Sequence, residues 1–170
     1  SFVHGTDGVV LDSTYPIYQF EFINIHPSVD NTKFQFNMST DSGSNYNVTK
    51  TDTAFKAYHH ETDGGTGLTY DTGEDLAQST SDSILTVGGG IGTDNDQNAS
   101  GTLTLYNPSS TTFVKHYISN FNNYHHGNYS INGFSAGYGN TTSAVNAVIF
   151  RMQSGNIDDG KIKLYGIKDS

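Results

Sequence analysis

The sequence contains no cysteine and no tryptophan, and it has only one arginine, Arg151. Without cysteine the chain forms no disulfide, no thiolate metal site and no thiol nucleophile. No segment approaches the roughly 18 consecutive apolar residues that would cross a membrane as a helix. We therefore expect neither membrane insertion nor cysteine-based chemistry.

Positive charge is scarce. Eight Lys and Arg face 17 Asp and Glu, which gives a formal net charge of -9. The nearest approach to a basic cluster is Lys161, Lys163 and Lys168, and the first two alternate with Ile162 and Leu164 as on the solvent face of a strand. Because proteins bind nucleic acids largely by neutralising phosphates with Lys and Arg, we expect no DNA or RNA partner.

Small polar residues and glycine dominate what is present. Ser, Thr, Asn and Gly account for 73 of the 170 residues, and the hydrophobic fraction is only 34%. A composition this polar is compatible with disorder, but disordered chains are poor in aromatic residues. Here 11 Tyr and 10 Phe fall largely at alternating positions. The sequence therefore predicts a folded β protein.

Alternation between apolar and polar residues marks the strands. Tyr18, Phe20 and Phe22 fall on one face of a predicted strand at 16–25. A second strand at 33–39 places Phe34, Phe36 and Met38 inward and Lys33, Gln35 and Asn37 outward. The strand predicted at 52–59 has Phe55, Ala57 and His59 on one face. Further strands are predicted at 84–87, 102–107, 113–121, 134–138 and 161–167.

The segments between these strands carry turn residues. We predict a long acidic loop at 60–80, a polar loop at 122–132 and a turn at 155–160. Residues 143–153 fit either a helical stripe or a strand buried on both faces, and the strand is favoured because helix is nearly absent elsewhere. About eight strands without βαβ alternation predict an all-β fold. We expect one domain at 1–170, an antiparallel β-sandwich of jelly-roll type with little or no helix.

Signatures of enzymes are weak. Gly133-Phe-Ser-Ala-Gly137 matches the G-x-S-x-G nucleophile elbow, but a polar loop follows it where that motif requires a helix. Glycoside cleavage needs two carboxylates that face one cleft, and the three glutamates, Glu21, Glu61 and Glu74, single out no pair. We expect a protein that is not an enzyme.

The sequence also predicts no metal site and no cofactor. Asp94-Asn-Asp-Gln-Asn98 begins like a calcium loop, but Ala99 replaces the required glycine and Leu105 the required glutamate. A looser oxygen-ligand site in the acidic loops at 71–75 or 94–98 stays an alternative. Adjacent histidines on a strand point to opposite faces, so neither His-His pair is expected to chelate one ion.

Two Tyr-His-His segments are the most site-like features. Tyrosine, histidine and asparagine side chains stack on and hydrogen-bond sugars or protein partners. The alternative is that these are ordinary loops or subunit contacts. The candidate recognition residues are Tyr58, His59, His60, Tyr124, His125, His126, Asn128 and Tyr129.

Several stretches resemble one known family. They are 1–18 (SFVHGTDGVVLDSTYPIY), 22–27 (FINIHP), 107–116 (NPSSTTFVKH), 142–150 (TSAVNAVIF) and 152–167 (MQSGNIDDGKIKLYGI). Together they resemble the virion structural proteins of marine tailed bacteriophages, especially those that infect cyanobacteria. The resemblance covers nearly the whole chain and identifies a family without defined catalytic residues. Family members often carry a further segment before the position of Ser1, so the chain is expected either to start inside a longer gene product or to have had that segment removed.

The resemblance implies a jelly-roll subunit on the exterior of a virion, as a capsid decoration or a tail or fibre component, assembled in the cytoplasm of the bacterial host. By this analogy we expect a homo-oligomer, a trimer, in contact with other virion proteins. The first alternative is a lectin-like module that binds a host-surface glycan for attachment. A depolymerase of host capsule or lipopolysaccharide is a third hypothesis.

Overall fold

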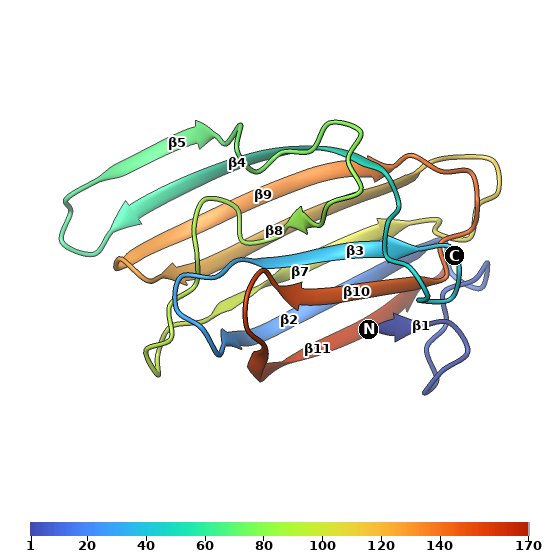
Figure 1. Cartoon of the computed structure of the whole chain (residues 1–170), viewed down its shortest axis with the longest axis horizontal. Helices are drawn as coiled ribbons and strands as arrows, with labels where there is room; N and C mark the ends of the chain where they lie inside the picture. Colours follow the sequence, from blue (N-terminus) through green and yellow to red (C-terminus); the bar gives the residue numbers. More distant parts are fainter. Residues whose placement is uncertain (170) are drawn as a thin grey trace.

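Two antiparallel β-sheets form the molecule (Figure 1), and the computed structural model describes residues 1–169. No helix occurs among these residues, and none is therefore present that could cross a membrane. The strands are β1 Phe2–Val3, β2 Ile17–Pro27, β3 Phe34–Ser39, β4 Lys50–His60, β5 Thr66–Tyr70, β6 Ser83–Ile84, β7 Ala99–Tyr106, β8 Lys115–His125, β9 Tyr129–Gly139, β10 Ala147–Met152 and β11 Ile157–Ile167.

The larger sheet has seven strands in the order β11-β2-β7-β8-β9-β4-β5, and the smaller has four in the order β1-β10-β3-β6. The chain passes between the sheets from β2 to β3 to β4, and again from β9 to β10 to β11, whereas β7, β8 and β9 form a meander. The predicted all-β antiparallel sandwich is confirmed, with eleven strands in place of about eight. The jelly-roll topology stays a prediction.

Aromatic rings fill the space between the sheets. The predicted inward residues Tyr18, Phe20 and Phe22 of β2 are buried, as are those of β3. Phe150 of β10 lies edge-on to Phe20 and Phe22, with ring centroids 4.9 and 4.8 Å apart. Aromatic pairs prefer such edge-to-face contacts, which add stability beyond the area that they bury. The alternating aromatics of the sequence therefore form one interlocked core.

The ambiguous segment at 143–153 contains strand β10, as favoured. β10 pairs with β3 along its whole length and with the short β1 on its other side. Val148 is fully buried and Ile149 is half-buried. The face of β10 with Val148, Phe150 and Met152 is buried, whereas the other face becomes exposed toward Arg151, so the strand is not buried on both faces along its whole length.

Four local predictions are wrong. Asn37, predicted to face outward, is buried, because its amide donates to Asp82 Oδ1 (2.8 Å) and the carbonyl of Thr80 (3.0 Å). The segment at 60–80 is not all loop, since β5 forms within it as an edge strand. The segment at 122–132 is largely strand: β8 and β9 continue to His125 and from Tyr129, and only residues 126–128 turn. The turn predicted at 155–160 ends early, since β11 begins at Ile157 and reaches Gly160 through register shifts.

The seven-stranded sheet is wider than its partner. In Figure 1, β9, β4 and β5 extend past the edge of the four-stranded sheet. The loop at 85–92 covers part of this overhang: a Cβ at Gly133 of β9 would lie 2.8 Å from the carbonyl oxygen of Val87. Glycine on β9 thus permits a close approach that any side chain would block. The overhang leaves an open inner surface at the end of the sheet.

Where β4 of the large sheet faces β3 of the small sheet, the interior contains polar side chains. Lys50 of β4 is fully buried, and its ammonium donates to Asn37 Oδ1 (2.6 Å) and the carbonyl of Val48 (2.9 Å). Burial lowers the pKa of Lys50 to about 8, although Asp82 and Asp52 nearby favour the charged form. Burial also lowers the pKa of Lys115. The fold therefore holds lysines that are harder to protonate than in the unfolded chain.

This burial predicts that stability rises with pH between 8 and 10. An unfolded lysine has a pKa near 10.4, so in this range the unfolded chain binds more protons than the folded one, and raising the pH favours folding. For Lys50 the expected gain in unfolding free energy is about 2 kcal/mol. Urea denaturation at several pH values measures it, and Lys50→Met is expected to remove most of the slope. The measurement stops at pH 10, since the raised pKa of Tyr117 reverses the sign above that value. A flat profile in the unsubstituted protein would contradict the assignment.

Candidate functional site

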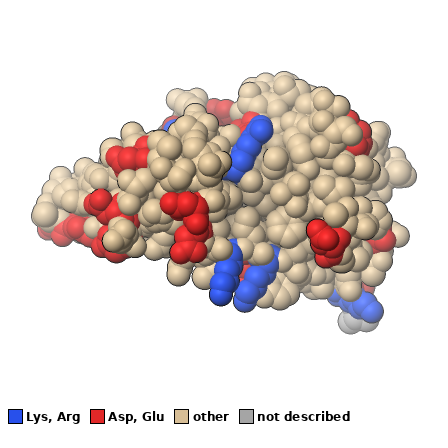
Figure 2. Space-filling model, turned by 60° about the horizontal axis from the view of Figure 1, so that its bottom comes forward, with Lys and Arg blue, Asp and Glu red and all other residues tan. Residues whose placement is uncertain are grey.

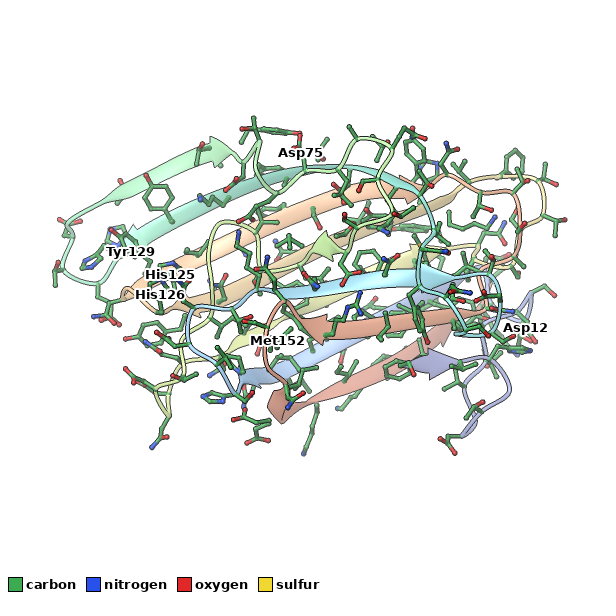
Figure 3. The ribbon with its side chains drawn as sticks, viewed as in Figure 1. Asp12, Asp75, His125, His126, Tyr129 and Met152 are labelled. Atoms are coloured by element: carbon green, nitrogen blue, oxygen red, sulfur yellow. The ribbon has the colours of Figure 1, made fainter. Side chains whose placement is uncertain are left out.

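Strand pairing brings the two Tyr-His-His segments together at one end of the large sheet. In the β4–β9 pair, His60 lies opposite Tyr129 and Tyr58 lies opposite Ile131. In the β8–β9 pair, His125 lies opposite Tyr129. Figure 3 shows His125, His126 and Tyr129 close together at this end. Segments more than sixty residues apart in the sequence therefore share one place in the fold.

Alternation along the strands divides the eight predicted residues between two faces. Tyr58 and His60 share the inner face with the side chains opposite them on β9 and β8, whereas His59 lies on the outer face. Tyr124 likewise lies on the outer face, next to His125 on the inner. His126 and Asn128 are exposed in the turn, where Asn128 has a φ of 63°. The structure thus gathers Tyr58, His60, His125 and Tyr129 on the inner face, with the exposed ring of His126 beside that of His125 (centroids 4.2 Å apart). It separates His59, Tyr124 and Asn128 from them.

Three of these residues, Tyr58, His125 and Tyr129, line a cleft of about 300 Å³, which we call the aromatic cleft. His60 packs edge-on against Tyr129 without lining the cleft. Tyr129 lies at its centre, with the ring of His60 at 4.5 Å, that of His125 at 5.7 Å and that of Tyr58 at 6.0 Å, all edge-on. A Cβ at Gly67 of β5 would lie 2.8 Å from the Tyr58 ring, so this glycine lets the ring lie across the neighbouring strand. The remaining lining residues are Lys56, Thr69, Gly88 and Ile131.

Hydrogen bonds set the tautomer that the neutral form of His125 and of His60 adopts. His125 Nδ1 accepts from the backbone N–H of Gly127 (3.0 Å), and His60 Nδ1 accepts from that of Thr62 (3.1 Å). An Nδ1 that accepts leaves the proton of a neutral ring on Nε2. Burial, followed by the charges of His126 and Lys56, lowers the pKa of His125 to about 4. His125 is therefore neutral near pH 7.

The one cation of the cleft is already paired. Lys56 Nζ lies 3.0 Å from Asp71 Oδ2 and donates to the carbonyl of Gly88 at 3.2 Å. Its stem packs against Gly88, which has a φ of 96° that favours glycine. The cleft thus presents aromatic rings, tyrosine hydroxyls and the neutral imidazole of His125, and the one lysine among its described lining residues is paired.

A second hollow lies on the outer face, around Tyr124 and His59, with a volume of about 290 Å³. A hydrogen bond to Glu61 raises the pKa of Tyr124, and His59 Nε2 lies 3.2 Å from Asp63 Oδ1 at an exposed position. The strand separates this hollow from the aromatic cleft. The predicted recognition residues therefore belong to two surfaces.

Sequence analysis missed Lys56, Thr69, Gly88 and Ile131 as cleft residues. Lys56 and Ile131 were within its reach, because each lies two positions from a predicted tyrosine on the same strand and so faces the same way. Thr69 and Gly88 could not be predicted from the sequence, since tertiary packing determines where β5 and the loop at 85–92 lie. Their contribution becomes visible only in three dimensions.

The other motifs form no reactive group. Ser135 of the G-x-S-x-G match is buried in the middle of β9 and shares a hydrogen bond with Ser119 (2.7 Å). Glu74 is buried, paired with Lys33, and accepts from the backbone N–H of Gly88 (2.7 Å). Within residues 1–169, no three His, Asp or Glu side chains are grouped so that they could hold a metal ion.

The described residues thus form an aromatic cleft on the inner face of the large sheet and a second hollow on its outer face. No family model, no curated protein and no solved structure matches the chain.

Proposed function

We propose that the protein is a non-enzymatic structural component of a bacteriophage virion, displayed on the particle exterior, which works by assembling with further copies of itself and with other virion proteins. The observation that carries the proposal is an uncharged, partly apolar surface on the large sheet. The sequence resemblance to phage virion proteins supplies the particle context. A trimer is the expected state by the same analogy.

The surface in question, which we call the outer face, comprises the outward side chains of β5, β4, β9, β8 and β7. Its apolar members include Leu68, 74% exposed, and Ile118, 52% exposed. Phe55 of β4 stacks on Phe134 of β9 with centroids 4.8 Å apart and planes 9° apart, and Tyr70 of β5 lies opposite Phe55. Contiguous exposed apolar groups of this kind are typical of interaction sites.

The outer face also carries no charge. None of the outward side chains on these five strands is Asp, Glu, Lys or Arg, although the whole chain has a net charge of -9. Figure 2 shows another side of the molecule, where acidic side chains gather toward one narrow end and the few basic ones stand apart. Copies with the same net charge repel each other, so an uncharged face is where they meet at least cost.

The area suits a specific interface. Strands lie about 4.8 Å apart and rise about 3.3 Å per residue, so the five strands, which have between 5 and 11 residues, cover on the order of 800 Å². A standard-size interface takes about 800 Å² from each partner. A second copy on the outer face therefore buries enough surface for stable association.

The experiment compares two substitutions that change the net charge equally. Ile118→Lys places a charge in the middle of the outer face, and Val29→Lys places one at an exposed position in the turn after β2. Sedimentation velocity at increasing protein concentration is expected to show oligomers for the unsubstituted chain and Val29→Lys, and monomers for Ile118→Lys.

Two results would count against assembly through the outer face. One is a monomeric unsubstituted chain at the highest soluble concentration. The other is an Ile118→Lys variant that associates as strongly as Val29→Lys. In a map of a particle that contains the chain, the same face is expected to lie at a contact between subunits.

A further inference from the structure

We propose that the aromatic cleft binds one residue of a neutral carbohydrate. This function goes beyond assembly through the outer face, because the cleft lies on the opposite face of the sheet, at its free end. The inference depends on the rings that line the cleft, the hydrogen-bonding groups at their tips and the charge around them.

The rings provide a stacking surface. Tyr58, His60 and His125 surround Tyr129 edge-on, so the rings hold one another in place. A tyrosine presents an apolar ring to the C–H groups of a sugar and a hydroxyl to its oxygens. Within the described part of the chain, the hydroxyls of Tyr58 and Tyr129 have no hydrogen-bond partner and remain available to a ligand.

The histidines add donors of defined direction. Since Nδ1 of His60 and of His125 accepts a backbone N–H, each neutral ring carries its proton on Nε2. With both Nδ1 atoms occupied in this way, the pair is poorly suited to a metal ion. The His125 Nε2–H and the hydroxyls of Tyr58 and Tyr129, which line the cleft, match the hydroxyl groups of a sugar, which both donate and accept.

Charge selects a neutral ligand. His125 is uncharged because its pKa is about 4, and Lys56 is paired with Asp71. At the rim, the β4–β5 turn carries the exposed Glu61 and Asp63. Acidic side chains also gather at a narrow end of the molecule in Figure 2. Anionic ligands such as uronic acids, sialic acids and phosphate are therefore disfavoured. A cationic ligand is not favoured either, since none of the described lining residues is acidic.

Size and stiffness complete the argument. A cleft of about 300 Å³ lies at the small end of ligand sites, which suits one sugar ring with the rest of a glycan in solvent. The rings come from paired strands, and Tyr58 is seated against Gly67. A site that is already formed loses little conformational entropy when a ligand binds.

The test is a titration with neutral monosaccharides and oligosaccharides, and with uronic and sialic acids as the anionic set, followed by ¹⁵N NMR of the full chain. We expect saturable shifts at Tyr58, His60 and Tyr129 with at least one neutral sugar, and none with the anionic set. Tyr129→Ala and Tyr58→Ala are expected to weaken binding at least about tenfold. Tyr124→Ala, whose ring lies on the outer face, is the matched control and is expected to bind as the unsubstituted chain does.

The proposal is overturned if no neutral sugar binds saturably, or if anionic sugars bind as strongly as neutral ones. It is also overturned if Tyr124→Ala weakens binding as much as Tyr129→Ala. Spectra of the free variants show whether each is folded, and Tyr129→Phe, which keeps the ring and loses only the hydroxyl, is expected to bind with intermediate strength. Sedimentation of the same variants tests self-association independently of sugar binding. Tyr129→Ala is expected to associate normally, and Ile118→Lys is expected to bind sugar normally.

Discussion

Replacing Phe22 by alanine is expected to lower the free energy of unfolding by about 3–5 kcal/mol. Phe22 is 2% exposed, and its ring contacts those of Phe34, Phe121 and Phe150 with centroids 5.4, 5.0 and 4.8 Å apart. Its removal leaves a cavity at the junction of both sheets and also breaks three aromatic pairs. Because domains are stable by only about 5–15 kcal/mol, the variant is expected to be close to unfolding at 37 °C.

Urea denaturation followed by circular dichroism and tyrosine fluorescence measures this loss, since the chain has no tryptophan. Phe113→Ala is the control: Phe113 is 69% exposed in the turn before β8, so its truncation is expected to cost less than about 0.5 kcal/mol. Equal losses for the two variants would show that the aromatic cluster is not the centre of the core.

Asp52→Ala is expected to be nearly as damaging, at about 3–5 kcal/mol, for a different reason. The Asp52 carboxylate is buried and accepts from Ser83 Oγ (2.5 Å), Tyr117 Oη (2.6 Å) and the backbone N–H of Leu76 (2.6 Å). Removing it leaves the buried hydroxyls of Ser83 and Tyr117 with only each other (2.7 Å) and the part-buried N–H of Leu76 without its acceptor. An unsatisfied buried polar group costs about 1–3 kcal/mol. The same denaturation experiment measures the effect.

Asp52→Asn keeps the size of the side chain and changes only its hydrogen-bonding atoms, so it distinguishes the effect of lost hydrogen bonds from the effect of lost volume. It keeps one oxygen as an acceptor, and the two hydroxyls can turn to accept from its amide, so the expected loss is smaller than that of Asp52→Ala. Thr53→Ala, on the exposed side of the same strand, is expected to change stability by less than about 0.5 kcal/mol. If Asp52→Ala were as stable as Thr53→Ala, the buried network would not stabilise the fold.

The two-residue alternation predicted the aromatic half of the fold, because there the core is apolar and each strand displays its pattern directly. Asn37 could not be placed in the same way. Its burial depends on Asp82 and Lys50, which satisfy its amide from other segments. β5 was missed because it is a short edge strand, mostly exposed on both faces, and so has no alternation to detect. The Asn-rich ends of β8 and β9 resemble a loop in sequence because their outer side chains face solvent.

The candidate site was predicted by residue type but not by geometry. The tyrosine, histidine and asparagine side chains at 58–60 and 124–129 singled out eight residues, and the β4–β9 register then placed Tyr58 and His60 beside Tyr129. Period-two alternation could have separated His59 and Tyr124 from them in advance. No sequence pattern could have supplied Gly67 and Gly88, since these matter only through the side chains that pass over them.

The order of strands has a consequence for synthesis. β2 finds its edge partner in β11, with Ile17 opposite Ile167, and β3 finds its partner in β10. Neither the β2–β11 pair nor the β3–β10 pair can therefore form until the ribosome has synthesised most of these 170 residues. Until then the aromatic side chains of β2 and β3 lack the strands that cover them, and such long-range pairing is slow. Nascent chains that end before β10 are expected to be the form most prone to aggregation, and the synthesis of β10 and β11 is expected to allow the core to close.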